Sequence, residues 1–290
     1  MPNLFFGAVQ YLLLKGYDHE LKEFYGSMVN RPKEAAAAFP SFRLFCLQKR
    51  NDIIPILQSK RVQTNEVRRC AYLYPAFCYI YENTNKPLAL IEIGTSAGLQ
   101  LCWDKFGYDY GAGETYGDVH SNLVLTSEVK GDTAPFLLKQ SPPVAARIGL
   151  DLHVNDLGNP EDYLWLKSLI WPEHRERIAN FEKAAHNMKE QSVKLIEGDG
   201  VKLLADIVSE IAEEAVIVVF HTHVANQLSD ENKLELAACI EKLGNERELF
   251  HLYNNMWDSN LHLDGYLDGK AFKKTIAETE GHGRWFRWML

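Results

Sequence analysis

The residues best placed for chemistry lie at the end of one apolar run. Leu88 to Ile93 is apolar except for Glu92, which is typical of a strand buried on both faces of a parallel sheet. Gly94 and Gly98 follow, before a helix-like segment that begins at Leu99. Glycines let the backbone turn sharply and let a ligand approach the start of the next helix, where free amides favour a polar or anionic group. We therefore predict a ligand site between the two glycines.

This turn fits two chemistries. The spacing of Glu92, Gly94 and Gly98 resembles the first motif of the Rossmann-like, S-adenosylmethionine-dependent methyltransferases, in which the glycines make room for the methionine end of the cofactor. The resemblance implies a cofactor site at Glu92, Gly94, Thr95, Ser96 and Gly98, although Ser96 stands where the more specific motif has a third glycine. The same residues spell Gly-x-Ser-x-Gly, the nucleophile elbow of hydrolases, with Ser96 as the nucleophile. A tight turn without a ligand is the third interpretation.

Two further acids are expected at the same edge of the sheet, where Rossmann-like folds bind their ligands. Asp151 lies in an expected strand, Arg147 to Val154, and is our choice for accepting both ribose hydroxyls, because a carboxylate offers two acceptor oxygens. Glu128 is the alternative, since the inserted segment makes the strand count ambiguous. Asp199 follows Gly198 and resembles the acid that receives the adenine amino group. For each acid the plain alternative is a solvated surface carboxylate.

Two histidines follow the most strand-like run of the chain, Ala215 to Phe220. His221 and His223 stand, with Thr222 between them, where methyltransferases place a motif beside the transferred methyl group. A histidine there can act as a general base near neutral pH, so we predict catalytic roles for both. Alternate residues of a strand point to opposite faces, and the sequence offers no further zinc ligands, so we expect no metal site. A histidine that is simply hydrogen-bonded at a strand end is the alternative.

A polar run interrupts the apolar helical region near the N-terminus. It consists of Gln63, Thr64, Asn65, Glu66 and Arg69. Asn65 can cap the helix that follows, with Glu66 in its first turn. Capping does not explain Gln63 and Arg69 together, so we predict that the run folds over the cofactor or lines the substrate pocket.

The elements that position these residues are of two kinds. Residues 1–86 show helical periodicity and no convincing strand, which predicts an all-helical cap. Residues 87–290 alternate strands with helices and end in an antiparallel hairpin, with an inserted loop or hairpin at about 107–155. We therefore predict an α/β fold: a Rossmann-like, mostly parallel sheet with a C-terminal antiparallel hairpin and an N-terminal all-helical cap. Hydrolases usually place strands before the elbow, whereas only helices precede it here, so this order favours the methyltransferase.

Composition and charge limit the classes of partner that we expect for this chain. The chain has 290 residues, of which 46% are hydrophobic and 24% charged, which is ordinary for a soluble globular protein. Its net charge of −8 argues against a broad phosphate-binding surface, so nucleic acid is not the expected partner. The sequence contains no run of 18 apolar residues, so we predict no membrane-spanning helix. The five cysteines are widely spaced and lack a Cys-x-x-Cys pair, which predicts a reducing cytoplasm rather than a disulfide framework.

Several motifs together resemble one bacterial family. They are Val62 to Cys70, Glu92 to Leu99, Asp109-Tyr110-Gly111, Arg147-x-Gly149-x-Asp151-Leu152, Trp171-Pro172, Gly198-Asp199 and Val219 to Thr222. On these residues the chain is identified as a member of the family catalogued as domain of unknown function 2332, over nearly its whole length. The family is similar in fold to S-adenosylmethionine-dependent methyltransferases, so the resemblance implies that architecture. It also implies longer members in which a further helical piece precedes this N-terminus.

These observations predict a cytoplasmic, S-adenosylmethionine-dependent methyltransferase. It would pass the methyl group in line to a small-molecule or protein acceptor beneath the cap. Positioning and exclusion of water would supply most of the rate enhancement, because the sulfonium already carries the leaving group. Two alternatives stay open. One is an α/β serine hydrolase that pairs Ser96 with a later histidine, and the other is a ligand-binding protein that keeps the fold without turnover.

Overall fold

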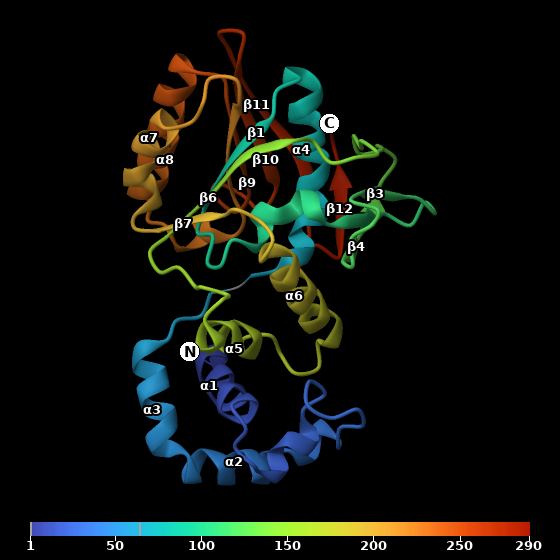
Figure 1. Ribbon diagram of the computed structural model, residues 1–290, viewed down its shortest axis with the longest axis vertical. Helices are drawn as coiled ribbons and strands as arrows, with labels where there is room; N and C mark the ends of the chain where they lie inside the picture. The colour runs from blue at the N-terminus through green and yellow to red at the C-terminus, as the bar shows by residue number, and fades with distance from the viewer. Residues whose placement is uncertain (1, 64) are drawn as a thin grey trace. The chain divides into compact units, whose positions relative to one another are not determined.

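The computed structural model describes residues 2–63 and 65–290 of the chain (Figure 1). The chain falls into two compact units. The smaller unit comprises residues 1–65 and 155–182, and the larger unit comprises residues 66–154 and 183–290. Helix α6 (Arg175–Met188) contributes residues to both. In the described residues, no helix is both long and apolar enough to cross a membrane.

The smaller unit is built from helices and short 3-10 turns in the residues described. Its elements besides α6 are α1 (Pro2–Leu14), η1 (Glu20–Phe24), η2 (Ala35–Ala37), α2 (Phe39–Gln48), α3 (Arg50–Ser59) and α5 (Pro160–Ser168). Helix α5 begins where its sequence favours a start, because the side chain of Asn159 accepts a hydrogen bond from the Glu161 amide and a proline follows the cap. Apolar side chains of four of these helices share one core, which includes Leu12, Phe45, Ile53 and Trp165.

The larger unit is built on a nine-stranded sheet in the order β5-β12-β11-β10-β9-β8-β1-β6-β7. The strands are β1 (Leu88–Ile93), β5 (Glu128–Lys130), β6 (Val144–Asp151), β7 (Lys194–Glu197), β8 (Val216–His221), β9 (Leu249–Tyr253), β10 (Leu261–Leu267), β11 (Lys270–Thr279) and β12 (Trp285–Trp288). The five strands from β9 to β7 run parallel, and β10, β11 and β12 continue the sheet antiparallel. A separate sheet in the order β3-β2-β4 is formed by β2 (Gly107–Asp109), β3 (Thr115–Gly117) and β4 (Val124–Thr126).

Helices cover both faces of the parallel strands, as Figure 1 shows. On one face, α7 (Gly200–Ser209) and α8 (Asp230–Glu246) pack on a core that includes Ile91, Leu150 and Val219. The other face carries α4 (Cys70–Thr84) and the 3-10 segment η4 (Leu99–Lys105). There the ring of Phe77 stacks on Trp103 and meets Phe220 edge-on, with centroids 4.4 and 5.5 Å apart. Burial on both faces explains the continuous apolar runs of the central strands.

The alternation of a strand decides where its polar residues lie. On β1, Glu92 falls between Ile91 and Ile93, both of which belong to the core beneath α7 and α8, so Glu92 points to the α4 face. On β8, His221 follows Val219 by two residues and therefore lies on the same face as α7 and α8. The two side chains are thus separated by the sheet.

The predicted mixed α/β fold with a large, mostly parallel sheet is confirmed, and β6 is the strand beside β1. The predicted C-terminal antiparallel pair is present as β11 and β12, whereas β10 was not predicted. Residues 66–86, which the sequence assigned to the cap, belong to the sheet unit. Helix α4 explains the difference, because ten of its residues are buried and helical periodicity does not reveal which partner buries them. All five cysteines are free thiols.

Candidate functional site

The predicted ligand turn closes the carboxyl end of β1 in a left-handed backbone conformation. The φ angles are +74° at Gly94, +54° at Ser96 and +77° at Gly98. Glycine adopts such angles freely, whereas a serine there stores backbone strain. Ser96 and Thr95 are almost fully buried, with exposed fractions of 3% and 2%. The turn therefore has the backbone shape that the glycine spacing predicted, but its side chains lie inside the protein.

Most amides of this turn are already hydrogen-bonded within the protein. The amides of Gly94 and Thr95 donate to the carbonyl of Leu150 at 2.8 and 3.2 Å. The Ser96 amide donates to Oδ2 of Asp151 at 2.7 Å. The turn thus binds the end of β6 instead of presenting these three amides to a ligand.

Val224 fills the space over the turn. It belongs to η5 (Val224–Gln227), and a Cβ atom added to Gly94 would lie 2.3 Å from its Cγ2. In the methyltransferases that this motif resembles, the glycines make room for the cofactor. Here the same room is occupied by an aliphatic side chain, so a ligand reaches Gly94 only when Val224 moves aside.

Glu92 is a buried acid that lies beside the turn. Its Oε2 accepts a hydrogen bond from the Thr95 hydroxyl at 2.6 Å, and the residue is 4% exposed. Burial is the main reason why the pKa of Glu92 is raised to about 8. The hydrogen bond from Thr95 and the positive charge of Arg69 lower the pKa, whereas the negative charge of Asp151 raises it. Most molecules therefore carry a neutral Glu92 at pH 7. A cation arriving beside it would favour the ionised form and release a proton.

Asp151 is the acid that the sheet brings to the turn. Its Oδ2 accepts from the Ser96 amide, and its Oδ1 accepts from the His153 amide at 3.1 Å. Glu128, the alternative acid, begins β5, which pairs with β12 at the far edge of the sheet. The third predicted acid, Asp199, caps α7 by accepting from the Val201 amide at 3.1 Å. Asp151 and Asp199 keep part of their surface exposed, so both can meet a ligand.

His221 lies inside the sheet rather than at a site. Its exposed fraction is zero, and its Nε2 lies 3.1 Å from Nε2 of His251 on the neighbouring strand. Burial lowers the pKa of His221 to about 4, so the pair is neutral near pH 7. A side chain without exposed surface does not contact a substrate in this conformation. This burial gives no support to the predicted catalytic role of His221, and it favours the alternative of a hydrogen-bonded strand-end histidine.

His223, unlike His221, is only partly buried. It adopts a φ of +61°, and its amide donates to Oδ1 of Asn254 at 2.9 Å. Its Nδ1 lies 3.2 Å from Nδ2 of Asn255, while its Nε2 is buried with no hydrogen-bond partner in the described residues. Burial, and to a smaller extent the nearby charge of Arg69, lower the pKa of His223 to about 4. The imidazole is thus neutral over the physiological range, and a ligand reaches its unpartnered but buried Nε2 only when neighbouring groups move aside.

A chain of hydrogen bonds joins the ends of several elements near His223. Arg69 Nε donates to the Gly281 carbonyl at 2.9 Å, and Nη1 donates to the Thr222 hydroxyl at 3.3 Å. The Thr222 hydroxyl donates to Oε1 of Gln100 at 3.2 Å, and Nε2 of Gln100 donates to the Glu66 carbonyl at 3.3 Å. We call these five residues the Arg69 network. Because Arg69 lowers the pKa of both Glu92 and His223, its charge links the turn to the histidine.

The polar run near the N-terminus is divided between the units. Gln63 and Asn65 lie in the smaller unit, where Gln63 Oε1 accepts from Asn155 Nδ2 at 3.0 Å, and Thr64 lies outside the described residues. Glu66 and Arg69 lie in the larger unit. The cap of η3 (Val67–Arg69) is Glu66, whose side chain accepts from the Arg68 amide, so the expected cap at Asn65 is wrong.

Sequence reasoning missed Gln100 and Asn254. Gln100 is the polar residue in an otherwise apolar segment just after the turn, and that contrast could have pointed to it. No group of three or more histidine, cysteine, aspartate and glutamate side chains within the described residues could hold a metal ion.

The comparison with protein families decides the affiliation. The profile of a family described as "Uncharacterized protein conserved in bacteria (DUF2332)" matches residues 1–288. The chain belongs to this family. The family membership that the motifs indicated is thereby confirmed, and the matched residues include the turn, the three acids and the Arg69 network. No curated protein shows a significant match to the chain.

Proposed function

We propose that the larger unit is a Rossmann-like, S-adenosylmethionine-dependent methyltransferase. Across the sheet, its five parallel strands lie in the order β7, β6, β1, β8 and β9. When these five strands are numbered along the chain, that order is 3-2-1-4-5. This is the strand order of doubly wound sheets, which bind nucleotides at the carboxyl ends where the order reverses. The observation that carries the proposal is that the glycine turn follows β1 at this reversal, with Asp151 on the adjacent strand.

Three acidic side chains suit the polar groups of the cofactor, but Val224 fills the space over Gly94. Asp151 would accept the ribose hydroxyls, and Asp199 would receive the adenine amino group. The carboxyl of Glu92 would ionise against the ammonium group. Binding would also require Val224 to leave the space over the turn.

The cofactor, when bound, supplies a methyl group on a sulfonium. The chain's residues would orient it and exclude water. His223, with a neutral ring and an unpartnered Nε2, would hydrogen-bond the acceptor once that buried atom is uncovered. With a pKa near 4 it would be a weak base, so an acceptor that loses its proton easily fits best. The net charge of −8 supports a small-molecule or protein acceptor. The role of the all-helical unit as a cap, and the cytoplasmic location, stay predictions of the sequence.

Calorimetry with S-adenosylhomocysteine on the full chain tests the proposal without a known acceptor. We expect one-to-one binding, weakened about 10- to 100-fold by Asp151→Asn, because a charged hydrogen-bond acceptor is worth about 1.5–3 kcal/mol. Glu128→Gln is the matched control, since Glu128 lies at the far edge of the sheet. No binding by a folded wild-type chain would refute the proposal, and equal losses in both variants would refute the role of Asp151.

One observation favours a second candidate, a serine hydrolase. Ser96 has the positive φ of +54° that a nucleophile elbow demands, in a Gly-x-Ser-x-Gly turn after a buried strand. Its 3% exposure argues against it. Labelling with a fluorophosphonate distinguishes the two. A hydrolase would be labelled, and Ser96→Ala but not Ser127→Ala would abolish the label, whereas the methyltransferase proposal expects no label at Ser96.

A further inference from the structure

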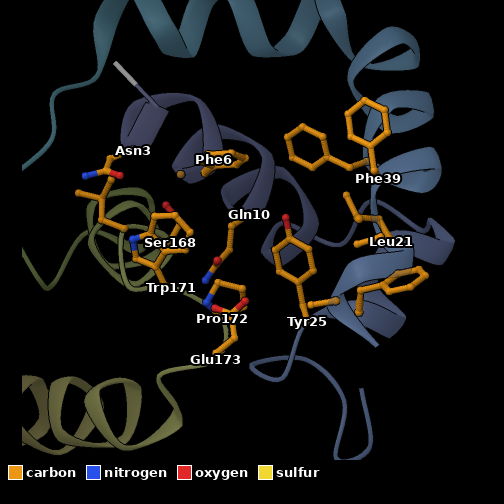
Figure 2. Close-up of a pocket in the computed structure, with 16 residues that line it drawn as sticks. Asn3, Phe6, Gln10, Leu21, Tyr25, Phe39, Ser168, Trp171, Pro172 and Glu173 are labelled. Atoms are coloured by element: carbon orange, nitrogen blue, oxygen red, sulfur yellow. The ribbon is translucent and has the colours of Figure 1, made fainter. Parts of the chain in front are cut away.

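The smaller unit contains a cavity of about 320 Å³, outside the unit that carries the proposed cofactor site (Figure 2). It is lined by side chains from α1, η1 and the start of α2, and by the segment from Ser168 to Glu173. This volume lies in the range of small-molecule sites. The cavity lies wholly within one unit, so its shape does not depend on the larger unit.

Aromatic rings dominate the cavity wall. The ring of Phe6 lies 5.5 Å from that of Phe42 and 5.6 Å from that of Trp171, measured between centroids. Three lining rings are also unusually exposed for large apolar side chains: Phe6 by 39%, Phe39 by 69% and Trp171 by 44%. Exposed rings that line one cavity can mark a binding site, because a ligand that covers them removes apolar surface from water.

Some polar side chains of the cavity are already hydrogen-bonded within the protein, whereas one hydroxyl faces the cavity. Gln10 Nε2 donates to the Ile170 carbonyl at 3.0 Å, and the Ser168 hydroxyl donates to the Trp165 carbonyl at 2.6 Å. The hydroxyl of Tyr25 points into the cavity in Figure 2. Burial raises the pKa of Tyr25, so its hydroxyl stays protonated.

The charge of the lining has one sign. Glu173 is an acid, and the lining side chains include no lysine or arginine. The neighbouring Arg175 directs its guanidinium to the carbonyls of Val29 and Asn30, at 2.9 and 3.0 Å. Glu173 is an exposed residue of the lining, so its carboxylate can attract a cation by direct charge, while the lining rings can attract it through their quadrupoles.

We propose that this cavity binds a small amphipathic cation, an alkylammonium that carries an aromatic-sized apolar part. The apolar part would lie among Phe6, Phe39 and Trp171, and the ammonium would lie at Glu173 with the Tyr25 hydroxyl as a further acceptor. The inference goes beyond the proposed function and does not depend on it, because a chain that binds no S-adenosylmethionine can still hold an amine here.

Titration of the full chain with tryptamine, followed by calorimetry, tests the proposal. We expect a dissociation constant on the order of 100 µM, as for other ligands of about a dozen heavy atoms. The neutral 3-ethylindole should bind about 10-fold more weakly, and indole-3-propionate, which carries a carboxylate instead, should bind more weakly still. Equal binding of amine and carboxylate, or no saturable binding of the amine, would overturn the proposal.

Variants locate the site. Glu173→Gln should weaken tryptamine binding about 10-fold and change 3-ethylindole binding less than 2-fold, because only the charge is removed. Trp171→Ala should weaken both probes. The control Glu214→Gln removes an exposed acid from a loop of the larger unit and should change neither. If tryptamine binding survives both Glu173→Gln and Trp171→Ala unchanged, the amine binds elsewhere and the assignment fails.

Discussion

For Glu92, the sequence predicted the position of the residue in the fold but not its protonation state. The sequence indicated an acid at the end of the first strand, and the structure has it there, 4% exposed. What the sequence could not indicate is the dehydration that raises its pKa to about 8, because the helix that covers it, α4, was assigned to another part of the molecule. Asp151 was predicted at this edge of the sheet with Glu128 as the alternative, and the structure favours Asp151 because the strand that it ends, β6, pairs with β1.

The raised pKa of Glu92 predicts how stability depends on pH. Between about pH 4.5 and 8 the folded chain keeps a proton that the unfolded chain has lost, so this residue makes the free energy of unfolding fall as pH rises, by up to about 1.4 kcal/mol per pH unit. Glu92→Gln should remove this contribution. Urea unfolding of wild type and variant at pH 5, 6.5 and 8 measures it, with Glu128→Gln as control. Parallel pH profiles for wild type and Glu92→Gln would contradict the buried, neutral acid.

The His221–His251 pair predicts the opposite trend at lower pH. The folded pKa of both imidazoles is lowered by burial, so between about pH 6.5 and 4 the unfolded chain binds protons that the folded chain excludes. Stability should therefore fall as the solution is acidified through this window. His251→Gln keeps a hydrogen-bonding partner for His221 and should reduce that fall. His120→Gln, at an exposed loop histidine, should leave it unchanged, and an equal effect in both variants would contradict the account.

At the scale of elements, the glycine turn and η5 are interlocked. Gly94 combines a φ of +74° with a Val224 methyl group only 2.3 Å from where an alanine Cβ would lie, so Gly94→Ala meets both strain and a clash. We expect a loss of about 2–4 kcal/mol in the free energy of unfolding. Gly111 is the matched control, because it has a φ of +82° with nothing within 4 Å, and Gly111→Ala should lose only about 1 kcal/mol. Equal losses would show that Val224 does not press on the turn.

Elements were predictable where burial is uniform. β1 and β8 were predicted because every residue in them is buried, so their sequences are almost wholly apolar. β10 was missed because His262, Asp264 and Gly265 interrupt its apolar pattern. Gly265 is required there, since a Cβ atom would lie 2.2 Å from the Phe272 ring on the paired strand.

At the scale of the whole molecule, the parts that the sequence did not reveal are assembled from distant segments. The smaller unit joins residues 1–65 with 155–182. The Arg69 network joins η3, η4, the residue after β8 and the loop before β12. Periodicity and spacing describe neighbours along the chain, so they predicted Glu66 and Arg69 as polar residues of interest but not their partners Gln100 and Gly281.

The central claim is that a cationic nucleoside cofactor binds beside Glu92, and proton release on binding tests it most directly. Calorimetric titration with S-adenosylhomocysteine at pH 7, repeated in two buffers of different ionisation enthalpy, measures the protons released. Because the pKa of Glu92 is about 8 without ligand and an adjacent ammonium would lower it, we expect release approaching one proton for wild type and near zero for Glu92→Gln. Absent binding, or binding with the same proton release in both chains, would contradict the claim.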